Sequence, residues 1–109
     1  MAEETGRNVQ SWGLEQIKRI VHDRLTNTHS RVYLFGSWAR GEQRRSSDVD
    51  VAVEFSASDE ENRRIVRSIR QALEDSTVPY KVDIVYLNEA DECIVGKVRK
   101  EGILWSAAL

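Results

Sequence analysis

Apolar side chains alternate with acidic and small ones over residues 48–55, and this alternation limits the folds open to the chain. Val49, Val51, Val53 and Phe55 are separated by Asp48, Asp50, Ala52 and Glu54. A period of two places each set on its own face of a β-strand. The segment is therefore predicted to be a half-buried strand with one apolar face and one acidic face. Asp48 and Asp50 leave this strand on the same face.

The rest of the chain divides into helical and extended segments. Apolar residues at steps of three and four predict an amphipathic helix over Asn8–Thr26. A β-branched and aromatic segment, Arg31–Phe35, predicts a buried strand that ends in a turn at Gly36. The further predicted elements are a polar loop over Gly41–Ser47, a helix opened by a capping box of Ser58 and Glu61 and running through Leu73, a strand over Lys81–Leu87, a helix over Asp91–Glu101 and an edge strand over Ile103–Trp105. This order predicts the α/β or α+β class, with a small mixed β-sheet.

Length, charge and hydropathy exclude several classes of protein. With 109 residues, of which 40% are apolar, the chain is predicted to form one domain, residues 1–109, with a hydrophobic core. A net charge of −2 argues against strong direct binding to nucleic acid. Cys93 is the single cysteine, which excludes an internal disulfide and fits a reducing compartment. The polar start and the short apolar runs predict neither a signal peptide nor a membrane span, so the expected location is the cytoplasm.

Three aspartates could form one acidic site. Asp48 and Asp50 lie two residues apart, so their Cα atoms are about 6.5–7 Å apart on one strand face. Asp83 interrupts the apolar run of the Lys81–Leu87 strand, where an unpaired buried charge would be costly. If the two strands are neighbours, the three carboxylates converge and repel one another unless a divalent cation binds them. The alternative is that all three are separate surface or turn residues.

A glycine and a serine follow the Arg31–Phe35 strand directly. Gly36 would let a phosphate approach the backbone, and the hydroxyl and amide groups at Ser37 could donate hydrogen bonds to it. Arg40 would face the same anion from the first turn of a short helix. The alternative is a plain turn between a strand and a helix. Trp38 would either stack on a base or pack in the core.

The spacing of these groups resembles a known signature. Gly36-Ser37, ten further residues and then Asp48-Val49-Asp50 resemble the motif of the DNA polymerase beta superfamily of nucleotidyltransferases, most closely its minimal nucleotidyltransferases. The resemblance runs from Arg31 to Trp105, with the motif core at 31–87. It implies a twisted mixed sheet with helices packed on one face and the motif residues on the opposite, open side.

The resemblance also implies the roles of the site residues. Asp48, Asp50 and Asp83 would be the catalytic residues that bind Mg²⁺, two ions in the family's mechanism, and Asp83 would help to deprotonate the acceptor. Gly36 and Ser37 would contact the triphosphate of ATP. Arg40 and Ser47, which lie within the spacing, are predicted to bind the nucleotide as well.

Proteins of this type are encoded beside a helical HEPN partner, and the resemblance implies a toxin–antitoxin pair. The chain is expected to transfer AMP from ATP to a tyrosine of a HEPN RNase toxin and to form a hetero-oligomer with it, because no part of its length is left for an acceptor domain. Its three tryptophans and the apolar tail Ile103–Leu109 are predicted partner contacts. One alternative is modification of a small molecule, as in aminoglycoside nucleotidyltransferases. The other is a non-catalytic antitoxin that acts by binding.

Overall fold

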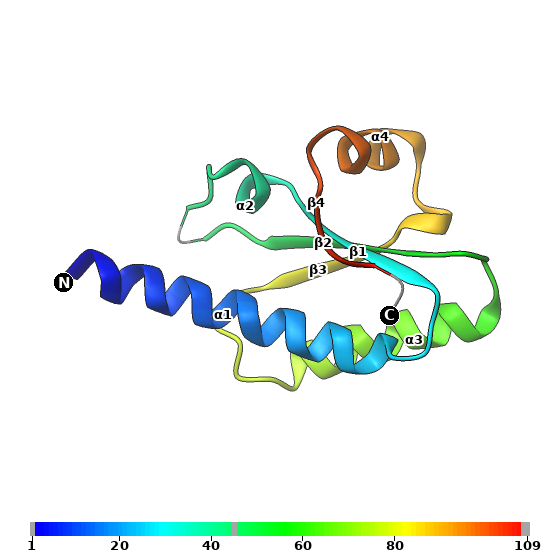
Figure 1. Cartoon of the computed structure of the whole chain (residues 1–109), viewed down its shortest axis with the longest axis horizontal. Helices are drawn as coiled ribbons and strands as arrows, with labels where there is room; N and C mark the ends of the chain where they lie inside the picture. Colours follow the sequence, from blue (N-terminus) through cyan, green and yellow to red (C-terminus); the bar gives the residue numbers. More distant parts are fainter. Residues whose placement is uncertain (1, 45, 108–109) are drawn as a thin grey trace.

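The computed structural model describes residues 2–44 and 46–107, with side chains described over 12–44 and 46–105. Figure 1 shows helices on both sides of one sheet. The elements in chain order are α1 (Ala2–Leu25), β1 (Ser30–Phe35), α2 (Ser37–Arg40), β2 (Val49–Phe55), α3 (Glu60–Glu74), β3 (Val82–Tyr86), the 3₁₀ helix η1 (Leu87–Glu89), α4 (Glu92–Glu101) and β4 (Ile103–Ala107). None of the helices in this described part is both long and apolar enough to cross a membrane.

The four strands form a mixed sheet in the order β3-β2-β1-β4. β1 pairs antiparallel with both β2 and β4, whereas β2 and β3 are parallel and are connected through α3. In the parallel pair Asp50 lies opposite Asp83. The predicted α+β class with a small mixed sheet is confirmed, and the register brings two motif aspartates side by side.

The alternation over residues 49–55 produces the main core, as predicted. Val49, Val51 and Val53 are fully buried on the face of β2 that α1 and α3 cover. The two helices contribute a matching apolar stripe to this layer, made of Ile17, Val21 and Leu25 from α1 and Val66, Ile69 and Leu73 from α3. This face of the sheet is therefore closed, and the motif residues cannot lie on it.

The other face of the sheet is not open along its whole length, and the expectation that all helices pack on one face is corrected here. Val98 of α4 and Leu87 of η1 are buried in a second cluster with Phe35 and Ala52. Ala52 is the one small apolar residue on the acidic face of β2, so α4 can approach the sheet closely there. Covering this apolar patch stabilises α4 on the face that carries Asp50.

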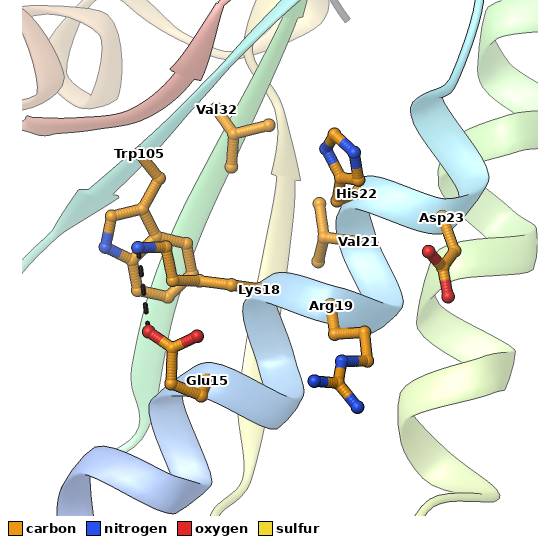
Figure 2. Close-up of a pocket in the computed structure, with 8 residues that line it drawn as sticks. All are labelled: Glu15, Lys18, Arg19, Val21, His22, Asp23, Val32 and Trp105. Carbon is orange, nitrogen blue, oxygen red and sulfur yellow. Dashed lines mark ion pairs between the residues drawn. The ribbon is translucent and has the colours of Figure 1, made fainter.

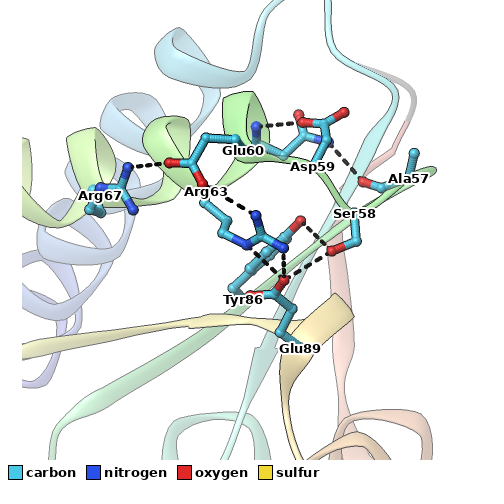
Figure 3. Close-up of polar contacts among 9 residues, drawn as sticks. Ala57, Ser58, Asp59, Glu60, Arg63, Arg67, Tyr86 and Glu89 are labelled. Carbon is cyan, nitrogen blue, oxygen red and sulfur yellow. Dashed lines mark hydrogen bonds and ion pairs between the residues drawn. The ribbon is translucent and has the colours of Figure 1, made fainter.

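The predicted capping box at Ser58 and Glu61 is wrong, and the cap is the next residue. Asp59 Oδ1 accepts a hydrogen bond from the backbone N–H of Asn62 at 2.9 Å, which caps α3. Ser58 instead donates to Glu89 of η1 at 3.1 Å. Figure 3 shows Arg63 between Glu60 and Glu89, so these contacts join the start of α3 to the segment after β3.

Other predicted boundaries shift by a few residues. α1 begins at Ala2 rather than at Asn8, and β3 ends at Tyr86 because Leu87 begins η1. The edge strand continues to Ala107, beyond the predicted end at Trp105. Of the three tryptophans, Trp38 is buried and Trp12 is 47% exposed. The end of the predicted tail, Leu109, lies outside the described residues.

Candidate active site

The three aspartates lie on one face at one end of two parallel strands. Asp50 is the second residue of β2, and Asp83 is the second residue of β3 and its register partner. Asp48 lies one residue before β2 and two residues before Asp50, which gives it the same side of the sheet. Asp50 is half-buried, whereas Asp48 and Asp83 are exposed. The structure thus places the three aspartates on one face at the same end of two neighbouring strands. From the sequence, it remained open whether these strands are neighbours.

The carboxylates act on one another electrostatically. Partial burial raises the pKa of Asp50 above its usual range, and the negative charges of Asp83 and Asp48 raise it further. Lys97 and Arg40 act in the opposite direction. Among the described residues, no three His, Cys, Asp or Glu side chains are grouped as closely as a metal centre requires. The magnesium site therefore stays a prediction, carried by the shared face and the mutual repulsion of its oxygen donors.

Gly36 connects the glycine–serine turn to the aspartates. Its φ of 78° and ψ of −157° belong to a region that only glycine enters readily. A Cβ atom built on Gly36 would overlap Asp50 Oδ2, so the backbone lies directly against that carboxylate. The carbonyl oxygen of Gly36 accepts hydrogen bonds from the N–H groups of Ala39 and Arg40, which start α2. The two halves of the motif therefore meet in space at one backbone position.

The chemistry of these side chains suits a hard divalent cation. The donor set consists only of carboxylate oxygens, which are the ligands that Mg²⁺ prefers. The backbone of Gly36 lies against Asp50, so a group bound at that carboxylate would also lie beside the turn. Asp48, Asp50 and Asp83 are the residues that would hold the ion.

The other residues predicted to bind the nucleotide differ in the contacts that their side chains already make within the fold. Ser37 is half-buried at the start of α2. The hydroxyl oxygen of Ser47 accepts a hydrogen bond from the Arg44 N–H at 2.8 Å, so it shapes the loop before β2. Arg40 donates from Nε to Glu42 at 2.6 Å and from Nη1 to Glu101 at 2.7 Å. Its guanidinium is thus held by two carboxylates in this structure.

Trp38 packs in the core rather than facing a base. Its ring contacts Tyr80 edge-on, with centroids 4.8 Å apart, and its Nε1 donates to the Ser47 carbonyl oxygen at 3.4 Å. These contacts hold α2 against the loop that leads into β2. Trp38 therefore positions the turn and the Asp48 segment relative to each other.

Two residues of α4 near the site were missed by the sequence reasoning. Lys97 is close enough to Asp50 to affect its pKa, and Glu101 forms an ion pair with Arg40. Both belong to a helix that was predicted, but nothing local in the sequence says which face of the sheet that helix covers. The only available signal was their spacing of four residues, which places them on one flank of a helix.

The pKa of Asp50 predicts a pH-dependent gain in stability for Asp50→Asn. Because folding raises the pKa, the folded protein binds a proton more readily than the unfolded chain, and the ionised carboxylate destabilises the fold at neutral pH. In metal-free buffer we expect the variant to melt above the wild type at pH 7. This difference should shrink as the pH falls, and vanish below the ordinary aspartate value of 3.8. Thermal melts of both proteins over pH 3–8 measure it, with exposed Asp23→Asn as the matched control. A variant that melts at or below the wild-type temperature at pH 7 contradicts the prediction.

Comparison with known proteins agrees with the fold. The sequence model of the family described as "Polymerase beta, Nucleotidyltransferase" matches residues 15–106. The chain is 28% identical over 92 residues to a protein of Methanocaldococcus jannaschii named "Putative protein adenylyltransferase MJ0435", covering 83% of this chain and 95% of that protein.

Solved structures with the same fold come from toxin–antitoxin complexes. One is a mutant of the toxin–antitoxin pair MntA–HpeT, with a TM-score of 0.65 and 26% identity over 85% of this chain and 71% of that one. Another is a toxin–antitoxin with AMP-PNP, with a TM-score of 0.59 and 26% identity over 83% of this chain and 73% of that one. Because the family match covers most of the chain and includes β1, β2, β3 and every motif residue, the chain belongs to the polymerase beta family of nucleotidyltransferases.

Proposed function

We propose that the protein transfers AMP from ATP, with Mg²⁺, to a tyrosine of a HEPN-type toxin and so acts as its antitoxin. The observation that carries this proposal is the contact between the Gly36 turn and Asp50, with Asp83 in register beside it. This arrangement supports the proposal that a phosphate binds at the turn, beside the three carboxylates. The similar protein from Methanocaldococcus jannaschii has a name that specifies protein adenylylation.

Each residue of the site is assigned a role in the proposed reaction. Bound Mg²⁺ would neutralise phosphate charge and polarise the α-phosphate. The Gly36 backbone and the Ser37 hydroxyl would hold the triphosphate, and Asp48 and Asp50 would hold the Mg²⁺ that compensates its charge. Asp83 is exposed and would accept the proton of the acceptor hydroxyl on a carboxylate oxygen. The acceptor oxygen then bonds to the α-phosphorus, the bond from that phosphorus to the bridging oxygen breaks, and pyrophosphate leaves.

A protein partner is supported by the relatives and by the exposed apolar surface. Both reported structures at 26% identity belong to toxin–antitoxin complexes, and one of them contains AMP-PNP. In this chain Trp12, Ile103 and Leu104 are each about half exposed. Large apolar side chains of this kind favour contact with another protein.

A pocket of about 550 Å³ between α1 and β4 adds to this surface. Figure 2 shows Glu15 and Lys18 of α1 beside the Trp105 ring, with Val32 behind them. Val32 and Trp105 pack with the main core, so the pocket lies on the face of the sheet opposite the aspartates. It contains none of the motif residues, and we assign it to partner contact rather than to nucleotide binding.

The test is co-expression with the product of the adjoining gene, which is expected to be a HEPN protein. After incubation with ATP and Mg²⁺, the intact mass of the HEPN protein is expected to rise by one or more AMP units. The Asp48→Asn variant should form the same complex and leave the mass unchanged. A complex that forms without any mass change in the wild type would indicate neutralisation by binding alone. AMP found only on a small molecule would overturn the choice of acceptor.

A further inference from the structure

The contacts of α4 fix how this helix is turned over the sheet. Val98 is buried with Ala52, and Arg99 donates to both carboxylate oxygens of Glu54, with an Nη1–Oε1 distance of 3.1 Å. Glu54, Ala52 and Asp50 follow one another on the same face of β2 at steps of about 6.5–7 Å. Arg99 thus contacts Glu54, and the neighbouring Val98 packs against Ala52. Lys97 lies on the opposite flank of Val98 from Arg99, and therefore on the side toward Asp50.

A second contact supports the same orientation. Glu101 Oε2 accepts a hydrogen bond from Arg40 Nη1 of α2 at 2.7 Å. Residues four apart occupy the same flank of a helix, so Lys97 and Glu101 both face the region between α2 and β2. This region contains Gly36, Ser37 and Asp50. Two independent contacts thus direct Lys97 to the proposed nucleotide site.

Lys97 of α4 and Arg40 of α2 are the two cationic side chains of this region, but they are not equally available. Arg40 is bound to Glu42 and Glu101, so its charge is already compensated. Lys97 is exposed and forms no ion pair within the described part of the chain.

We propose that Lys97, rather than Arg40, is the main side-chain cation for the β- and γ-phosphates of the nucleotide. This inference rests on the proposed function. A triphosphate placed beside three aspartates carries several negative charges that need compensation. The lysine ammonium is a mobile point charge on a flexible stem, which suits phosphates that later depart as pyrophosphate. Arg40 would then hold α2 to the end of α4.

The test is nucleotide affinity measured on the isolated chain, without any acceptor. ATP and AMP are titrated by calorimetry in Mg²⁺ buffer into the wild type, Lys97→Met, Lys97→Arg and Lys100→Met. Lys100 is exposed and three residues further along the same helix, so it controls for the loss of one positive charge. Thermal melts confirm that each variant is folded.

We expect Lys97→Met to weaken ATP binding about tenfold or more and AMP binding less than twofold, because AMP lacks the two phosphates concerned. Lys97→Arg should restore most of the ATP affinity, and Lys100→Met should leave both affinities unchanged. Equal loss of ATP and AMP, or an ATP affinity within twofold of the wild type, overturns the role of Lys97 while the proposed function stands. A wild type that binds neither nucleotide contradicts both.

Discussion

Asp50→Asn is expected to lower the rate of AMP transfer by about a thousandfold or more. Asp50 is the half-buried carboxylate that contacts Gly36 and lies opposite Asp83, so it is central to the proposed site. A carboxamide has the same shape but lacks the charge that would bind Mg²⁺. Metal ions supply several kcal/mol of transition-state stabilisation, and each 1.4 kcal/mol corresponds to about a factor of ten in rate. Asp48→Asn is expected to act in the same direction.

The rate is measured as the appearance of AMP on the HEPN protein, with all proteins at equal concentration. Glu74→Gln, an exposed loss of one carboxylate charge on α3 away from the site and from the pocket assigned to partner contact, should retain the wild-type rate. Because Asp50→Asn is also expected to be more stable than the wild type at neutral pH, a loss of rate cannot be attributed to unfolding. Wild-type turnover in Asp50→Asn would remove this carboxylate from the site.

Gly36→Ala is expected to destabilise the fold by about 2–3 kcal/mol. The cost of placing a side chain at this φ and ψ is of the order of 1–3 kcal/mol, and the new methyl group would also displace the Asp50 carboxylate. For a domain of this size 1 kcal/mol corresponds to roughly 4–8 °C in melting temperature. A thermal melt should therefore show a decrease of roughly 10–20 °C, together with loss of nucleotide binding.

Gly96→Ala is the matched control for this change. Gly96 lies in the interior of α4 and is exposed, and a Cβ atom built there meets nothing within 4 Å. Alanine favours a helix over glycine by about 0.5–1 kcal/mol, so this variant should melt above the wild type. Two glycine-to-alanine changes with opposite signs would show that the position, not the residue type, sets the cost. A Gly36→Ala variant as stable as the wild type would contradict the close approach to Asp50.

Where the sequence prediction failed locally, a contact from elsewhere in the fold was the cause. Ser58 has the chemistry of a cap, but its hydroxyl donates to Glu89, which follows β3, and accepts from the hydroxyl of Tyr86, the last residue of β3. Asp59 then caps α3 in its place. Arg40 also has a distant partner, because Glu101, which accepts a hydrogen bond from it, lies 61 residues away. A pattern read over a few residues contains no information about such distant partners.

The sequence alone determined the alternating strand at Val49–Phe55, the amphipathic helices and the spacing between Gly36 and Asp50. These features follow from local periodicity and from residue type, which act over a few neighbours. Tertiary structure decided that Asp83 pairs in register with Asp50, and that α4 covers the opposite face through Val98 and Ala52. It also decided which cationic side chains face the carboxylates, because Arg40 and Lys97 belong to α2 and α4, which meet β2 only in the folded protein.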